Sequence, residues 1–222
     1  MKIIANVFNG FNEKFGVPRQ SGLTDILSEI VFKPEYRVRE AFYRLEEFSH
    51  LWIIWKFSLA EKDDWSPTVR PPKLGGNERV GVFASRSPFR PNPIGLSCVK
   101  LEKIDYDRKD SPVLVVSGAD IVSGTPVYDV KPYIPYADCV PYASGGYSVD
   151  GDKAATEVIF TEKILKDTID NERLLCEIEE ILKQNPRPAY KKDGDRVYKM
   201  SYRNKTLSFI YSEEKIIALS FE

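Results

Sequence analysis

Cysteine and histidine are scarce in this sequence of 222 residues. The three cysteines, Cys98, Cys139 and Cys176, lie far apart and lack C-x-x-C spacing, so neither a zinc ribbon nor a disulfide framework is indicated. With His50 as the single histidine, a histidine-rich metal site is disfavoured, and we expect no metal. His50 itself is either a hydrogen-bonded structural residue or a catalytic base.

Long hydrophobic runs and an excess of one charge are also missing. No run approaches 18 apolar residues, so we expect no membrane span. The first six residues lack the apolar core of a secretory signal, and a cytoplasmic location is expected. The 32 Lys and Arg offset the 33 Asp and Glu to a net charge of −1. This excludes a globally basic protein but leaves room for a local basic patch.

The glycine-rich motifs of nucleotide-binding folds are absent. There is no G-x-G-x-x-G turn and no G-x-x-x-x-G-K-[ST] loop, and no G-x-S-x-G elbow is present. Gly75-Gly76-Asn77 precedes a candidate strand and is typical of a hairpin turn. We therefore do not expect a Rossmann-type fold.

The hydrophobic patterns predict a mainly β protein. Helical periodicity is clear only at about residues 35–47 and 171–184. Strands are predicted at residues 49–57, 80–85, 94–104, 113–121 and 127–130, and a three-stranded meander at 198–202, 207–211 and 217–221. A shift in composition at residues 142–153 indicates a linker. We expect a β-rich domain over residues 1–145 and a small α+β domain over 155–222, with one helix and the meander.

Three prolines between Ser87 and Pro93 stiffen a loop that carries Arg86, Arg90 and Asn92. Prolines reduce the entropy lost when a loop is held in one shape. Arginine binds carboxylates and phosphates through two parallel hydrogen bonds. We interpret the loop as a preorganised anion site, entered from the strand at 80–85. The competing interpretation is a turn with two solvated arginines.

Two other segments carry groups suited to a ligand. In the first, Arg19 and Gln20 follow Pro18. The competing interpretation of this segment is an ordinary surface loop. In the second, Gly124 permits either close backbone approach by a ligand or a turn with positive φ.

Asp129 and Lys131 lie two residues apart in a predicted strand and point to one face. They form either an ion pair or, with Tyr133 and Tyr136, the frame of a polar pocket.

Taken together, these segments resemble the TrmO family of S-adenosylmethionine-dependent tRNA methyltransferases. The resemblance is carried by Phe15-Gly16-Val17-Pro18-Arg19-Gln20, Phe48-Ser49-His50-Leu51-Trp52, the runs from Arg70 to Asn77, Phe83 to Gly95 and Gly124 to Tyr133, and Asn185-Pro186-Arg187-Pro188-Ala189-Tyr190. It implies an N-terminal β-barrel and a homodimer with S-adenosylmethionine bound near the subunit interface. The implied substrate is the tRNA anticodon loop, methylated at N6 of N6-threonylcarbamoyladenosine at position 37.

The resemblance also implies functional residues. Cofactor contacts carried over by position are Pro18, Arg19, Gln20, Ser58, Leu59, Arg86, Leu96, Ser123, Gly124, Thr125 and Pro126. Relatives often have His-Gln in place of Ser58-Leu59 and Asp in place of Ser123. We hypothesise that Asp129 takes or relays the N6 proton and that Arg86 or Arg90 pairs with the threonyl carboxylate. Expected substrate contacts are Arg90, Asn92, Lys131, Tyr133, Arg187 and Tyr190.

Two alternatives to an enzyme stay open at this point. One is a non-catalytic module that binds a nucleotide or RNA through the same Arg-Pro loop. The other is a scaffold whose prolines dock partners. The patch around Arg187 and Tyr190 is either a basic-aromatic contact for tRNA or a solvated loop.

Overall fold

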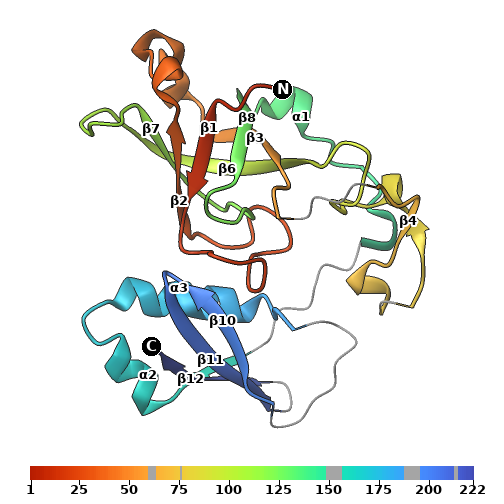
Figure 1. The fold of residues 1–222 in the computed structure, drawn as a ribbon, viewed down its shortest axis with the longest axis vertical. Coiled ribbons are helices and arrows are strands. Elements are labelled where there is room, and N and C mark those ends of the chain that lie inside the picture. Colours follow the sequence, from red (N-terminus) through yellow and green to blue (C-terminus); the bar gives the residue numbers. More distant parts are fainter. Residues whose placement is uncertain (60–63, 76, 149–156, 188–195, 213–214) are drawn as a thin grey trace.

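The N-terminal part of the chain forms a closed antiparallel barrel (Figure 1). The computed structural model describes residues 1–59, 64–75, 77–148, 157–187, 196–212 and 215–222. The barrel strands close in the order β1-β2-β7-β6-β3-β8. Their bounds are Ala5–Phe8 (β1), Leu27–Phe32 (β2), His50–Lys56 (β3), Ile94–Asp105 (β6), Val113–Ser117 (β7) and Pro126–Pro132 (β8). The mainly β, non-Rossmann fold expected from the sequence is confirmed.

The barrel core follows from strand alternation. In β3, Leu51, Ile53 and Trp55 are buried while their neighbours are half-buried. Ser111-Pro112 is a cis peptide bond in the turn before β7. None of the helices in the described part of the chain is long and apolar enough to cross a membrane.

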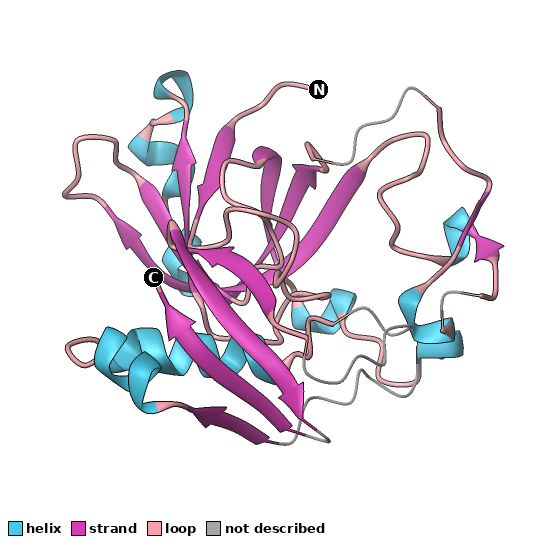
Figure 2. Cartoon of the chain, turned by 60° about the horizontal axis from the view of Figure 1, so that its bottom comes forward, coloured by secondary structure: helices cyan, strands magenta, loops and turns pink. Residues whose placement is uncertain are grey.

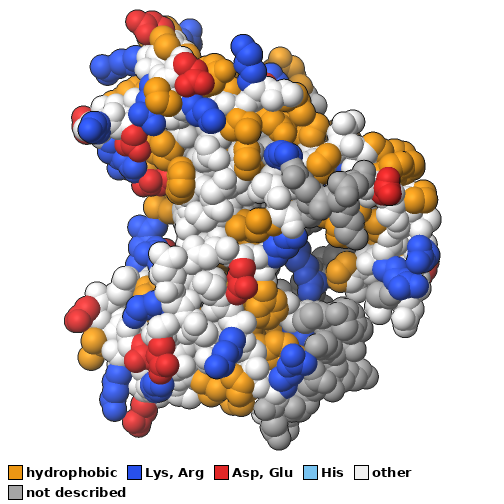
Figure 3. Space-filling model, viewed as in Figure 1, with side chains coloured by type: hydrophobic (Ala, Val, Ile, Leu, Met, Phe, Trp, Pro, Cys, Tyr) orange, Lys and Arg blue, Asp and Glu red, His pale blue; other side chains and the backbone are white. Residues whose placement is uncertain are grey.

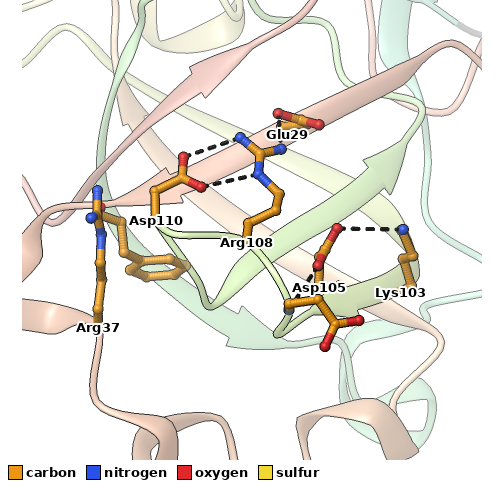
Figure 4. A network of polar contacts seen from close by, with 8 residues as sticks. Glu29, Arg37, Lys103, Asp105, Arg108 and Asp110 are labelled. Carbon is orange, nitrogen blue, oxygen red and sulfur yellow. Dashed lines mark hydrogen bonds and ion pairs between the residues drawn. The ribbon is translucent and has the colours of Figure 1, made fainter.

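An ion-pair network ties β2 to the connection between β6 and β7 (Figure 4). The Arg108 guanidinium lies 2.7 Å from a carboxylate oxygen of Glu29 and donates two hydrogen bonds of 3.0 Å to Asp110. Nearby, Lys103 pairs with Asp105 at 3.5 Å. Arg108 lowers the pKa of the Asp110 carboxyl group through the hydrogen bond and its charge. The network lies at the Asp105 end of β6, at the opposite end of this strand from residues 94–96.

Residues 58–93 leave the barrel after β3 and return at the start of β6. Their described part, 64–75 and 77–93, is called the arm. It holds a two-stranded ladder, Thr68–Val69 (β4) with Val80–Gly81 (β5), and turns of 3-10 helix at Pro72–Leu74 and Val82–Ala84. The backbone N–H of Phe57 donates to the carbonyl of Pro93 over 2.9 Å and closes the base of the arm.

The C-terminal part forms a four-stranded sheet packed on two helices (Figure 2). The elements are Glu157–Phe160 (β9), Glu162–Asp167 (α2), Glu172–Lys183 (α3), Tyr198–Tyr202 (β10), Lys205–Ser212 (β11) and Lys215–Phe221 (β12). Asn171 caps α3 by accepting a 2.9 Å hydrogen bond from the Leu174 N–H. The expected single helix and three-stranded meander therefore omitted α2 and β9. Both are too short to show periodicity, and β9 is defined by its parallel pairing with β12.

Other expected elements differ in the barrel domain. The predicted helix at 35–47 is three turns of 3-10 helix, Pro34–Tyr36, Arg39–Phe42 and Leu45–Glu47, and Arg44 has φ 67°. Of the expected apolar stripe only Phe42 is buried, edge-on to Phe32 with ring centroids 4.8 Å apart. The predicted strand at 80–85 ends at Gly81, and the one at 113–121 ends at Ser117. The pattern did not show β1, β2, β4 or the one-turn helix Pro135–Asp138 (α1).

Residues 9–25 join β1 to β2, but their aromatic side chains pack in the C-terminal core. Phe11 is 1% exposed and lies 5.3 Å, centroid to centroid, from the ring of Tyr202. Phe15 stacks against Phe209 at 6.2 Å. Gly16 has φ +91°, and a Cβ there would overlap the Met200 side chain. A connection of the barrel is thus an integral part of the second domain.

Hydrogen bonds hold both ends of this segment against the second domain. The Glu13 carboxylate accepts a 2.6 Å hydrogen bond from the Ser201 N–H. The Glu180 carboxylate on α3 accepts one of 2.7 Å from the Asp25 N–H. The segment is therefore attached to the C-terminal domain through the Glu13 side chain near its start and through the Asp25 main chain at its end.

Replacing Phe11 by Ala should destabilise the protein by about 3–5 kcal/mol, because it empties a fully buried aromatic site at the junction of the two domains. Urea unfolding followed by circular dichroism measures the loss. The matched control is Phe8→Ala, since Phe8 is 47% exposed at the end of β1. Equal losses for the two variants would show that the junction carries no special stability.

Candidate active site

A cavity of about 750 Å³ lies where the barrel, the segment 9–25 and the arm meet. Volumes of this size are typical of small-molecule sites. Its walls come from residues 14–20, the end of β3 with residues 57–59, the Arg86–Leu96 stretch and the turn 120–125. Figure 3 shows a hollow between the upper and lower halves of the molecule, with Lys and Arg side chains gathered beside it.

Trp55 forms part of the cavity wall, and a glycine on the neighbouring strand leaves space for its indole ring. Trp55 pairs with Gly95 across β3 and β6, and a Cβ at Gly95 would overlap the indole ring. The β3–β8 ladder also shifts register between Ile54 and Trp55. Such bulges change the direction of a side chain. The glycine and the bulge together let the indole lie against the β6 backbone.

A hydrogen-bond chain runs from the indole to a carboxylate. Trp55 Nε1 donates to Ser97 Oγ over 2.9 Å, and Ser97 Oγ donates to Asp120 Oδ1. Ser97 is 1% exposed, and Asp120 lies in the turn after β7. Burial raises the pKa of the Asp120 carboxyl group above its ordinary value. The bond from Ser97, the backbone N–H and the charge of Arg86 oppose that rise without cancelling it.

Serine turns and prolines hold the loop of the arm that follows Ser85. Ser85 Oγ accepts from the Ser87 N–H at 3.2 Å, and Ser87 Oγ accepts from the Phe89 N–H at 3.3 Å. The Arg90 guanidinium donates to the Ser85 carbonyl over 3.0 Å. The Arg86 guanidinium donates to the side-chain carbonyl of Gln20, which links the arm to the segment 9–25.

The C-terminal domain reaches the rim of the cavity through Arg187. Its carbonyl accepts a 3.1 Å hydrogen bond from the Arg19 guanidinium, and its N–H donates to the Tyr211 hydroxyl over 3.1 Å. The Arg187 guanidinium lies 4.5 Å above the Tyr211 ring. Burial raises the pKa of Tyr211 to about 12, so this hydroxyl stays protonated at neutral pH.

Comparison with known proteins shows the family of this chain. The model of the tRNA-methyltransferase O N-terminal domain matches residues 7–139, and that of the TrmO C-terminal domain matches 153–222. The chain belongs to the TrmO family. The tRNA (adenine(37)-N6)-methyltransferase of Escherichia coli K12 is 46% identical over 187 residues, 82% of this chain and 79% of that protein.

A solved structure supports the same assignment. The crystal structure of TrmO from Pseudomonas aeruginosa superposes with a TM-score of 0.80 at 30% identity, covering 99% of this chain and 97% of that one. A protein of Archaeoglobus fulgidus named S-adenosyl-L-methionine-binding protein is 35% identical over 145 residues, 65% of this chain and 96% of that protein.

Ten residues expected from the TrmO resemblance lie in the cavity wall. They are Pro18, Arg19, Gln20, Ser58, Leu59, Arg86, Arg90, Asn92, Leu96 and Thr125. Ser123, Gly124 and Pro126 flank the cavity turn without lining it. The Gly124 N–H donates to the Val7 carbonyl over 2.7 Å and the Ser123 hydroxyl accepts from the Asn9 N–H over 3.2 Å, so these bonds attach the turn to β1 and the residue after it. Tyr190 lies outside the described residues.

Asp129, Lys131 and Tyr133 do not line the cavity. Lys131 Nζ lies 2.8 Å from Asp129 Oδ2, and the Asp129 side chain is 45% exposed on β8. Of the two sequence interpretations of this pair, the structure has the ion pair. The Tyr133 ring packs 5.6 Å from that of Trp52. A direct role of Asp129 in proton transfer stays a prediction that the cavity does not support.

Sequence reasoning missed Asp120, Ser97 and Trp55 as site residues. One signal was available for Asp120, because it is the lone charged residue in the mostly apolar run from Val113 to Val122. A carboxylate so placed needs a partner or a function. Among the described residues, no cluster of three or more His, Cys, Asp and Glu could hold a metal ion.

Replacing Gly95 by Ala should destabilise the protein by about 1–3 kcal/mol, because the added methyl group overlaps the Trp55 indole on a packed wall. Thermal and urea unfolding measure the change. Gly81→Ala is the matched control, since a Cβ at Gly81 meets no atom within 4 Å. Two variants of equal stability would mean that Trp55 tilts away without cost.

Proposed function

We propose that this protein transfers the methyl group of S-adenosylmethionine to N6 of N6-threonylcarbamoyladenosine at position 37 of tRNA. Membership of the TrmO family makes the chain a tRNA methyltransferase, and the Escherichia coli relative is named for adenine 37. The observation that carries the finer assignment is the cavity itself, which brings together Arg86, Arg90 and a half-buried carboxylate, Asp120.

The cavity wall suits S-adenosylmethionine in size and chemistry. Trp55, Phe57 and Phe89 offer aromatic faces, and Leu59 and Leu96 are about half exposed at the wall, where a ligand would cover them. Arg19 offers a cation for the amino-acid carboxylate of the cofactor. When bound, the cofactor supplies a methyl group on a sulfonium centre. The work of the protein is then to position the nucleophile in line and to place charge.

Recognition of the threonyl carboxylate is assigned to the arm. Arg86 and Arg90 stand four residues apart in a loop stiffened by prolines and by serine turns. Their positions are set before substrate arrives, so little entropy is lost on binding. Asn92 follows in the same wall and offers an amide for the carbamoyl group.

Docking of the anticodon loop is assigned to cations at the rim. Lys14 and Arg19 come from the segment 9–25, and Arg187 comes from the C-terminal domain. Such residues bind phosphates and position the RNA without reading its sequence. Because the net charge of the chain is −1, we assign phosphate binding to these rim cations and not to the protein surface as a whole. Two other expected substrate residues, Lys131 and Tyr133, do not line the cavity and would need a second surface.

The second surface fits a homodimer, which we include in the proposal. Large apolar side chains at Phe83, Tyr136, Val140 and Tyr142 are exposed on the arm, on α1 and just after α1. Exposed apolar groups of this size are typical of interfaces. We also place the protein in the cytoplasm, where tRNA substrates are available.

Loss of this protein should remove methylated N6-threonylcarbamoyladenosine from tRNA and leave the unmethylated nucleoside in its place. Mass spectrometry of nucleosides from digested tRNA of a deletion strain measures both. Restoring the wild-type chain should restore the methylated form. An unchanged amount of methylated nucleoside in the deletion strain would refute the assigned reaction, and cofactor binding without methylation by purified protein would indicate a binding module.

Arg90→Ala should lower kcat/KM for tRNA by about 10- to 100-fold, because a charge-assisted hydrogen bond to the threonyl carboxylate is worth about 1.5–3 kcal/mol. Arg79→Ala is the matched control from the same arm. Arg79 donates to Thr68 Oγ1 at 2.8 Å and does not line the cavity. Radiolabelled methyl transfer gives the rates. Equal rates for the two variants would remove Arg90 from substrate recognition.

A further inference from the structure

Asp120 is the only carboxylate among the described residues that line the cavity. Its turn is held from two sides. Asn9 Nδ2 donates to the Ile121 carbonyl over 2.8 Å, and the Gly22 N–H donates to the Gly118 carbonyl over 2.8 Å. The carboxylate therefore has a defined position, set by the connection between β1 and β2.

The Asp120 side chain lines the cavity, and one of its carboxylate oxygens accepts a hydrogen bond. Oδ1 accepts from Ser97, whose own oxygen accepts from Trp55 Nε1. With its own proton committed to Asp120, the Ser97 hydroxyl orients the carboxylate. A carboxylate held in this way has an oxygen left to accept a proton from a group in the cavity.

Charged side chains reach the cavity around Asp120 from two of its walls. The segment 9–25 brings Lys14 and Arg19, and the arm brings Arg86 and Arg90. Arg86 favours the ionised carboxylate through its charge. Ser97 on β6 and Trp55 on β3 are uncharged. Burial acts against these influences and raises the pKa of Asp120, which makes the carboxylate a better base than an exposed one.

We propose that Asp120 is the catalytic base that accepts the N6 proton during methyl transfer. This rests on the function proposed above. The nitrogen of a urea has a delocalised lone pair, so its attack requires loss of the proton. Asp120 meets the requirement by position, since it lines the same cavity as the arginines assigned to the threonyl group.

The step balances within the site. The N6–H bond breaks and its proton passes to a carboxylate oxygen of Asp120, while the nitrogen electron pair forms the bond to the methyl carbon. The carbon–sulfur bond breaks and its electron pair stays on sulfur. Asp120, now neutral, releases its proton to solvent when the products leave. Ser97 is a positioning residue that keeps the accepting oxygen turned toward the cavity.

A rival role for the same side chain is to neutralise the positive sulfonium. The two roles differ in what they predict for ligand binding. A counter-charge favours cationic S-adenosylmethionine over neutral S-adenosylhomocysteine, so its removal weakens only the first. A base acts on the transition state, so its removal leaves both affinities in place and lowers kcat.

The first experiment compares the wild-type chain with Asp120→Asn. We expect kcat for methyl transfer to tRNA to fall by about 100-fold or more, because general bases contribute on the order of 10²–10⁴. Calorimetry without tRNA should give affinities for both adenosyl ligands within about threefold of wild type, a change that costs less than about 0.7 kcal/mol. Asp110→Asn, at the far end of β6, is the matched carboxylate control and should keep the wild-type rate.

The second experiment is the pH profile. The wild-type rate should rise with pH as Asp120 ionises, at a pH above that of an exposed carboxyl group. Ser97→Ala removes the bond that favours the ionised form, so the rise should move to higher pH. In Asp120→Asn the rise should vanish.

A stability readout is independent of activity. The folded-state pKa of Asp120 is raised, so the stabilising effect of its neutral form is present at low pH and is lost as pH rises through that pKa. Asp120→Asn lacks this loss. Its melting temperature relative to wild type should therefore increase with pH.

Three outcomes overturn the assignment. Asp120→Asn could keep the wild-type rate, or weaken S-adenosylmethionine alone, which would make Asp120 a counter-charge. A loss in Asp129→Asn with none in Asp120→Asn would move the base to β8. No methylation by the wild-type chain would instead refute the proposed function itself, which separates the two failures.

Discussion

The packing of residues 9–25 into the C-terminal core is the contact on which the rest of this structure depends. Phe11 and Phe15 bury their rings against β10 and β11, while the ends of the segment continue into β1 and β2. The same segment supplies the Lys14–Gln20 wall of the cavity. Burial of a Phe side chain contributes about 1.5–3 kcal/mol, which offsets part of the conformational entropy lost when the connection is ordered. The second domain therefore sets the shape of a site that lies mainly in the first.

Electrostatics gives this cavity its chemical character. Among the described residues, four cations and one carboxylate line it, and desolvation of that carboxylate outweighs the attraction of Arg86. A site of this kind favours anionic substrate groups and yet keeps a group that takes up a proton. Burial disfavours the ionised form of this carboxylate. Ser97, which accepts a hydrogen bond from Trp55, holds the carboxylate in one orientation. Functional groups in energetically unfavourable surroundings are common where activity and stability conflict.

Local patterns predicted well what local physics controls. The loop of Arg86 and Arg90 was recognisable because prolines and serines constrain their own backbone, and both arginines line the cavity. The α3 helix showed its periodicity over twelve residues. The stripe at residues 35–47 had the same spacing but formed 3-10 turns, because its one buried ring, Phe42, packs on Phe32 of β2 instead of on a helix partner. Short strands such as β1 and β9 exist only through their pairing.

The residues alone determined a near-neutral chain without a glycine-rich nucleotide loop, a mainly β character and a rigid arginine loop, since each depends on neighbours in sequence. The tertiary structure decided which carboxylate lines the cavity. Asp129 stands in the more conspicuous motif, yet strand geometry turns it toward Lys131. Asp120 comes from an apolar run and reaches the cavity only because the turn after β7 packs against Asn9, Gly22 and Ser97. These contacts join residues about 20 to 110 positions apart, which no local pattern encodes.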